Sequence, residues 1–167
     1  MPALTSAPFV VGPAQGLDAP LARLGTVHKV PAHVTDGHVA IVEHTLPPRQ
    51  LALPLHRHAR EDELTFVLYG SLGIKLGDDV IEAGQRSWIM KPRGQWHTFW
   101  NAGDMNVRFI ELLIPGGAEG YFERLSSLLC RNDAPEADAV GCLAAQYGIE
   151  FDFHSVEKLC REFDLIF

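Results

Sequence analysis

The stretch LPLHRHAREDELTFVLYG, from Leu53 to Gly70, decides the fold that this sequence predicts. It places two histidines, His56 and His58, two positions apart in an apolar run. In a β-strand such residues point to the same face of the sheet, so both imidazoles can reach one point. A short turn follows, and a second strand beginning at Glu63 would run antiparallel to the first. The stretch therefore predicts a hairpin that brings two imidazoles and one carboxylate together.

A second stretch, KPRGQWHTFWN from Lys91 to Asn101, supplies a third imidazole from a distant part of the chain. Pro92 and Gly94 predict a turn, and a strand is expected to begin near His97. Three imidazoles and one carboxylate make a donor set of three nitrogens and one oxygen. This set suits one divalent ion of Fe, Mn, Ni, Co, Cu or Zn, and differs from the oxygen ligands that Ca and Mg prefer.

The two stretches resemble the two motifs of the cupin family of small jelly-roll barrels. The first family motif ends in H-x-H, three or four residues, Glu, six residues and Gly. Here the motif reads H-R-H at 56–58, four residues, Glu63, six residues and Gly70. The second contains P-x-G-x-x-H-x-x-x-N, which Pro92 to Asn101 match in full. By this resemblance, the metal ligands are His56, His58, Glu63 and His97.

The resemblance covers the chain from about residue 38 to residue 114 and departs from the family pattern at two places. Gln50 stands where the first motif usually opens with Gly. Seven residues separate Gly84 from Pro92, where the second motif usually has five. Both departures lie in turns and loops away from the ligands, so they concern local loop shape and not the metal site.

The rest of the chain agrees with a mainly β fold, a single cupin jelly-roll barrel (double-stranded β-helix) with a short C-terminal helical region. Residues 1–25 are rich in Ala, Pro and Gly and are expected to form an N-terminal arm. Between residues 26 and 114, short apolar runs alternate with turn residues, as in an all-β barrel. The predicted strands are Thr26–Val30, His38–Leu46, Leu51–His56, Glu63–Tyr69, Ser71–Leu76, Val80–Ile81, Ser87–Met90, His97–Asn101 and Asn106–Leu113.

Residues 115–167 are expected to form about three short helices that pack on the barrel or on a partner subunit. Asp133 is expected to cap the second helix and Gly148 to end it. The predicted apolar faces are Tyr121, Phe122, Leu125, Leu128 and Leu129 in the first helix, Val140, Leu143, Ala144 and Tyr147 in the second, and Val156, Leu159, Cys160 and Phe163 in the third.

Two acidic neighbours compete with Glu63 for the role of carboxylate ligand. Glu61 does not fit the family spacing, whereas Asp62 fits its shorter form. Alternation along the strand that begins at Glu63 makes the better inward face, so Glu63 is preferred. Glu61 and Asp62 are expected to be solvated or paired with Arg57 or Arg60.

Alternation also divides the aromatic residues between the two faces of the predicted sheets. Phe66, Trp96 and Trp100 would point outward, and exposed aromatic clusters on a small barrel are typical of an interface. The outer sheet is therefore expected to pack on the C-terminal helices or on a second subunit, and a homodimer is predicted. The side chains expected to line a substrate pocket beside the metal are Tyr69, Phe99, Thr65 and His44.

The composition limits the kinds of binding partner and the cellular compartment that we expect. The formal net charge of −7 disfavours nucleic acid and anionic membranes as partners. The N-terminus has no basic segment before an apolar run, and no stretch has the length of a membrane span, so a cytoplasmic location is expected. Cys130, Cys142 and Cys160 are expected to be buried apolar residues and not a disulfide framework.

A metal held by four side chains keeps positions open for water, dioxygen or a chelating small-molecule substrate. The resemblance implies first a metal-dependent dioxygenase similar to flavonol (quercetin) dioxygenases, with Glu63 as ligand and catalytic base. A non-redox isomerase, cyclase or lyase and a non-catalytic binding or sensor protein are the alternatives. The sequence contains no nucleotide fingerprint and no serine nucleophile elbow, which disfavours hydride transfer and serine hydrolysis.

Overall fold

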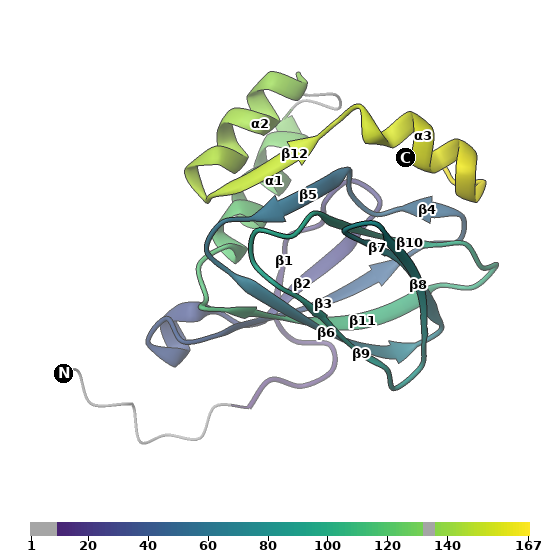
Figure 1. The fold of residues 1–167 in the computed structure, drawn as a ribbon. Coiled ribbons are helices and arrows are strands. Elements are labelled where there is room, and N and C mark those ends of the chain that lie inside the picture. Colours follow the sequence, from purple (N-terminus) through teal and green to yellow (C-terminus); the bar gives the residue numbers. More distant parts are fainter. Residues whose placement is uncertain (1–9, 132–135) are drawn as a thin grey trace.

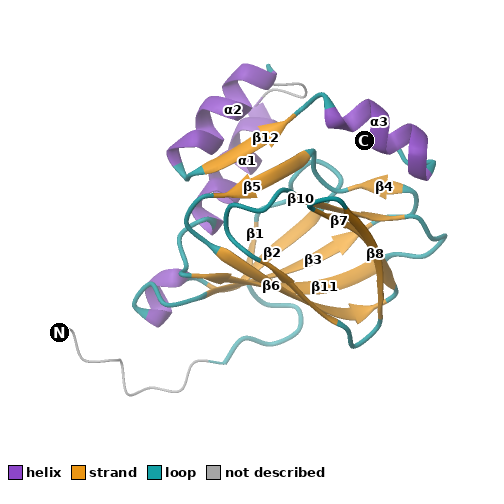
Figure 2. Ribbon diagram, viewed as in Figure 1, coloured by secondary structure: helices purple, strands orange, loops and turns teal. Residues whose placement is uncertain are grey.

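The computed structural model describes residues 10–131 and 136–167 (Figure 1). Two antiparallel sheets form a jelly-roll barrel, and three helices follow it (Figure 2). The first sheet has the order β1-β2-β3-β11-β6-β9, and the second has the order β12-β5-β10-β7-β8 with β4 paired to β10. The predicted mainly β fold with a short C-terminal helical region is confirmed.

The elements of the first sheet are β1 (Leu17–Asp18), β2 (Gly25–Val30), β3 (Ala40–Leu46), β6 (Asp62–Tyr69), β9 (Trp88–Lys91) and β11 (Val107–Ile114). Those of the second are β4 (Gln50–Leu51), β5 (Leu55–His58), β7 (Ser71–Leu76), β8 (Asp79–Gly84), β10 (His97–Asn101) and β12 (Ile149–Asp152). The helices are η1 (Ala32–Thr35), α1 (Glu119–Arg131), α2 (Ala137–Gln146) and α3 (Ser155–Phe163).

The predicted strands occur with four differences. The predicted hairpin is wrong, because β5 lies in the second sheet and β6 in the first, and Glu63 reaches the imidazoles from the facing sheet. The short strand β1, inside the predicted N-terminal arm, was not predicted and pairs with β2. The run Leu51–His56 is divided into β4 and β5, because the chain leaves the sheet around Pro54, which has no amide proton to donate to a ladder. An additional strand, β12, lies between the second and third helices and pairs with β5. Asp133, expected as a helix cap, lies outside the described residues.

Alternation along the strands fills the barrel interior with apolar side chains. β3 and β11 bury every second residue, and the two strands pair along seven residues. Val67, Phe109 and Leu113 are fully buried between the sheets. The interior is therefore close-packed with apolar side chains between the two sheets.

The N-terminal arm and the C-terminal helices cover the barrel. Leu21 and Leu24 of the arm are buried against the core that includes α1 and β12. The ring of Phe163 in α3 stacks on Trp100 of β10 with 4.2 Å between ring centroids. Trp100 points away from the barrel interior, as expected, and α3 covers it there. Among the described residues no helix has both the length and the apolar character of a membrane crossing.

The prediction that all three cysteines are buried is wrong. Cys130 and Cys142 are exposed, and Cys160 is half-buried against the cluster around Trp100. The reason is helix geometry, because Cys130 lies one position past the apolar face of α1 and so is rotated toward solvent. All three are free thiols.

Phe163→Ala should lower the free energy of unfolding by about 2 kcal/mol, because it removes the ring that covers Trp100. Phe167→Ala is the matched control, since the Phe167 side chain is 61 % exposed and its removal should change stability by less than about 0.5 kcal/mol. Denaturant unfolding followed by tryptophan fluorescence measures both variants. Equal effects would show that α3 does not stabilise the barrel through this stack.

Candidate functional site

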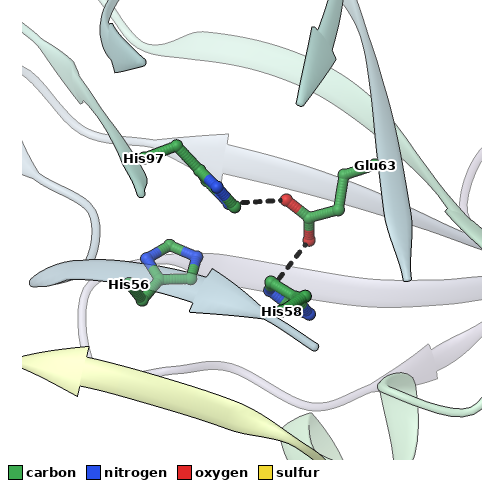
Figure 3. Close-up of side chains that lie close together, drawn as sticks. All are labelled: His56, His58, Glu63 and His97. Carbon is green, nitrogen blue, oxygen red and sulfur yellow. Dashed lines mark ion pairs between the residues drawn. The ribbon is translucent and has the colours of Figure 1, made fainter. Parts of the chain in front are cut away.

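The four residues predicted as metal ligands meet at one end of the barrel (Figure 3). β5 carries His56 and His58, β6 carries Glu63, and β10 carries His97. His56 and His97 are direct partners across the β5–β10 pair, which fixes their separation. All four side chains are buried, and one potential ligand atom from each lies within 4.8 Å of the others. The group could hold one metal ion.

Backbone carbonyl groups set the protonation of two of the imidazoles. Nδ1 of His56 lies 2.9 Å from the carbonyl oxygen of Pro54, and Nδ1 of His97 lies 3.0 Å from that of Gln95. A carbonyl oxygen only accepts hydrogen bonds, so in both rings Nδ1 carries the proton in the neutral form. Nε2 is then left with its lone pair, the state in which an imidazole binds a metal.

The contact between His97 and Glu63 fits a bound cation. Nε2 of His97 lies 2.9 Å from Oε2 of Glu63 and has no hydrogen-bond partner in the part of the chain that the structure describes. With Nδ1 protonated, this contact places a lone pair against a carboxylate oxygen. Two acceptors at this distance repel each other unless a proton or a metal cation lies between them. The donor set, three imidazole nitrogens and one carboxylate, matches a divalent transition metal.

His58 lies between two carboxylates. Its Nε2 is 3.4 Å from Oε1 of Glu63, and its Nδ1 is 3.4 Å from Oε2 of Glu61. The expectation that Glu61 is solvated or paired with an arginine is therefore wrong, because Glu61 is buried behind the imidazole. A carboxylate in this position orients the ring of a metal-binding histidine and makes it more basic.

Asp62 and Arg57 also have partners other than those expected. Asp62 binds the side chain and the backbone amide of Arg93, which lowers the pKa of Asp62 to about 2. Arg57 forms an ion pair with Glu150 of β12 instead, at 2.6 Å. The first pair joins the start of β6 to the loop before β10, and the second joins β5 to β12. Both therefore fasten ligand-bearing strands to their neighbours.

Charge and burial shift the pKa values of the site in opposite directions. Burial, with His97 and His58 nearby, holds the pKa of His56 well below its ordinary value, so His56 is neutral. Burial alone would lower the pKa of His58 too, but Glu63 and Glu61 outweigh it and the pKa is raised. Burial opposes ionisation of Glu63, yet Lys91 and the imidazoles keep its pKa well below the usual range.

Lys91 and Glu111 are buried inside the barrel beside the four-residue group, and the sequence analysis missed both. Nζ of Lys91 lies 2.7 Å from Oε2 of Glu63 and also forms an ion pair with Glu111. Burial would lower the pKa of Lys91, but Glu111 and Glu63 raise it, so the amine stays charged. Strand alternation could have predicted that Lys91 points inward, because it follows the buried residue Ile89 by two positions in β9.

The network continues from Glu111 to a second histidine. Oε2 of Glu111 lies 3.2 Å from Nε2 of His44, and its Oε1 accepts a hydrogen bond from Thr65. Nδ1 of His44 lies 2.9 Å from the hydroxyl of Thr26. Thr26 therefore holds His44 at Nδ1, whereas Nε2 has no hydrogen-bond partner among the described residues and faces Glu111, which Thr65 supports from β6.

A small enclosed cavity adjoins these groups. Its free space is about 10 Å³, roughly what one water molecule needs. Phe99 and His44 line it, as expected, whereas Thr65 points inward but acts through Glu111. Other lining residues are His56, His58, Glu63, Glu111, Leu21, Leu24, Leu53, Tyr121, Phe122, Ile149 and Phe151.

The prediction that Tyr69 lines this cavity is wrong, because its side chain is 49 % exposed. A β-bulge between β6 and β11 is the reason. Arg108 pairs with Tyr69 and Phe109 pairs with Val67, so Leu68 is an extra residue on β6. The extra residue reverses the direction of the side chains that follow it.

Comparison with known proteins agrees with this fold. Residues 42–114 match the model of the cupin domain (Cupin_2). The sequence has no match among curated proteins. A predicted oxalate decarboxylase from Thermotoga maritima is similar in structure, with a TM-score of 0.58 and 17 % identity over 64 % of this chain and 99 % of that one.

Two structures from Streptomyces are also similar. The polyketide cyclase RemF of Streptomyces resistomycificus has a TM-score of 0.56 and 22 % identity over 65 % of this chain and 80 % of that one. The nucleoside dehydratase Pac13 of Streptomyces has a TM-score of 0.56 and 10 % identity over 68 % of this chain and 88 % of that one. The barrel described here therefore has the cupin fold and carries, at one end, a buried group that could bind a metal ion.

Proposed function

We propose that this protein is a metal-dependent enzyme that acts on a small, partly apolar molecule able to chelate the ion. One observation carries the proposal. The cavity beside the four ligands also contains His44 and Glu111, a buried acid–base pair that is not needed to hold a metal. Buried ionisable groups are expensive to maintain, and at a cavity they are typical of sites that move protons.

The geometry supports proton-transfer chemistry of the isomerase, cyclase or lyase type. A bound divalent ion would polarise a carbonyl or hydroxyl group of the substrate. His44 faces the cavity with Nε2 beside Glu111, and it can accept or return a substrate proton there. Lys91 keeps Glu63 and Glu111 ionised, so Glu63 remains available as a ligand. The three similar structures differ in chemistry, so their fold does not decide among these reactions.

A metal-dependent dioxygenase similar to flavonol dioxygenases is the second candidate. The donor set of three imidazoles and one carboxylate supports it, because this set suits redox metals as well as zinc. Phe99 adds an apolar wall that suits a flat substrate. In this reaction Glu63 would take the proton of the substrate hydroxyl.

Metal analysis followed by turnover tests would separate these candidates. Freshly purified protein is analysed for bound metals, reloaded with the ion found, and given flavonols and small diketones with and without oxygen. Turnover without oxygen supports the proposal, and oxygen uptake supports the dioxygenase. Protein that cannot be loaded with any divalent transition metal, or that binds ligand without product, contradicts both enzymes.

The outer face of the first sheet supports a further proposal, a homodimer. The rings of Phe66 and Trp88 are in contact at a tilt, with 4.3 Å between centroids, and Trp88 and Met90 are 58 % and 48 % exposed. Such a patch is typical of an interface, and we propose a second copy as its partner. Light scattering should find a dimer for the natural protein and a monomer for Trp88→Glu. A monomeric natural protein would refute the dimer.

Glu63→Gln and Glu61→Gln form a matched pair of substitutions. Glu61→Gln should weaken metal affinity about tenfold, because Glu61 acts only through the orientation of His58. Glu63→Gln should weaken it much more, because a ligand charge is lost. Metal affinity is measured by competition with a chelator of known strength, and equal losses would rule out Glu63 as the ligand.

His44→Gln should reduce turnover about 10²- to 10⁴-fold, because it removes the proton carrier from the cavity. Metal content should stay at the natural level, since His44 is not among the four ligands. His33→Gln serves as control because His33 is exposed outside the barrel. Turnover that persists in His44→Gln would exclude proton transfer by this imidazole.

A further inference from the structure

The four residues His56, His58, Glu63 and His97 are together called the metal-site group. A second, larger cavity lies beside the small cavity that adjoins this group. Its volume is about 280 Å³, near the lower end of the roughly 300–1,000 Å³ of small-molecule sites. Leu125 and Leu129 of α1, Val140 of α2 and Phe153 after β12 line it. Among the described residues, every side chain in its lining is apolar except that of Tyr121. It therefore suits a compact apolar group and not a charged one.

One layer of residues separates the two cavities. Leu21, Leu53, Tyr121 and Phe151 line both of them. The cavity beside the metal ligands has room for about one water molecule, so it cannot take a whole organic substrate as it stands. The apolar cavity has the missing volume. Rotation of side chains in this shared wall would join the two, a common change on ligand binding.

Tyr121 gives the shared wall a single polar group. Its side chain is fully buried, and its hydroxyl has no hydrogen-bond partner among the described residues. Burial raises the pKa of Tyr121, so the hydroxyl keeps its proton and is available as a donor. Buried tyrosine hydroxyls usually have a partner, and an unpaired one is destabilising. The unpaired donor at this wall indicates that a ligand supplies the acceptor.

We propose that the two cavities form one substrate site. The apolar cavity binds a ring-sized apolar body, Tyr121 donates a hydrogen bond to an oxygen at the junction, and the chelating end of the molecule lies toward His56, His58, Glu63 and His97. The substrate class is thus a small aromatic or alicyclic molecule with an adjoining carbonyl or enol group. The position of the chelating end rests on the proposed function, whereas the apolar pocket and the role of Tyr121 do not.

The pocket is tested first on metal-free protein, with 2-acetylnaphthalene and naphthalene as probes. Ala137→Phe, which narrows the apolar cavity, should weaken binding of both probes roughly tenfold or more. Ala139→Phe is the matched control, because Ala139 is on the same helix and faces a different surface depression. Equilibrium dialysis measures the affinities. Equal binding by the natural protein and both variants would overturn the pocket.

Tyr121→Phe tests the hydroxyl alone. It should weaken binding of 2-acetylnaphthalene roughly five- to tenfold and leave naphthalene binding unchanged, because only the ketone can accept the hydrogen bond. Its stability to denaturant should not fall, because the hydroxyl has no partner in the protein to lose. A loss of stability without a selective loss of ketone binding would show that Tyr121 is structural and would refute its role.

The connection between the two cavities is tested on zinc-loaded protein with hydroxamates. 2-Naphthohydroxamate should bind at least about tenfold more tightly than acetohydroxamate, and Ala137→Phe should abolish that difference. Equal affinities of the two hydroxamates in the natural protein would refute a joint site. Protein that binds the naphthyl ketone as expected but takes up no metal would refute the proposed function and the chelating end, and would leave the pocket and Tyr121 in place.

Discussion

The buried ammonium of Lys91 holds together the polar interior of the barrel. It contacts the carboxylates of Glu63 and Glu111, and all three groups are almost completely buried. These three groups together carry one net negative charge in a region of low dielectric constant, where an unbalanced charge is unfavourable. A cation among His56, His58, Glu63 and His97 would offset that charge. The same ion pairs that keep the carboxylates ionised thus prepare the group for a metal.

Strand register places these groups with little help from loops. Glu63 of β6 is directly opposite Lys91 of β9, and Thr65 is opposite Glu111 of β11. Because side chains alternate along each strand, this register brings these four polar side chains to the same face of the first sheet. A shift of one residue would turn Glu63 and Lys91 outward together. The metal-site group and the acid–base network are therefore products of the same pairings and cannot vary independently.

The sequence was sufficient to predict the four-residue group, because strand periodicity and two spaced motifs both pointed to it. The sequence was insufficient where the position of a side chain or strand depends on a residue far away in the chain. The bulge that turns Tyr69 outward arises from pairing with β11, and β12 exists because β5 offers an edge. Glu61 is buried beside the imidazole of His58, which a sequence pattern cannot show. Lys91 and Glu111 do occupy inward positions of their strands. Charged residues are usually exposed, so the sequence offered no reason to place them inside the barrel.

The elements that cover the barrel end differ in how they are connected to the metal-site group. Ile149 and Phe151 of β12 pair with His58 and His56 of β5, so the cover and the ligand strand share one hydrogen-bonded ladder. Moving β12 would strain the ligands, whereas α1 contributes Tyr121 through side-chain packing alone. Access for a substrate is therefore easier at the side chains of α1 and the N-terminal arm than at β12. If the two cavities form one substrate site, this asymmetry favours an entrance on the side of the apolar cavity, where entry would leave the positions of the four site residues undisturbed.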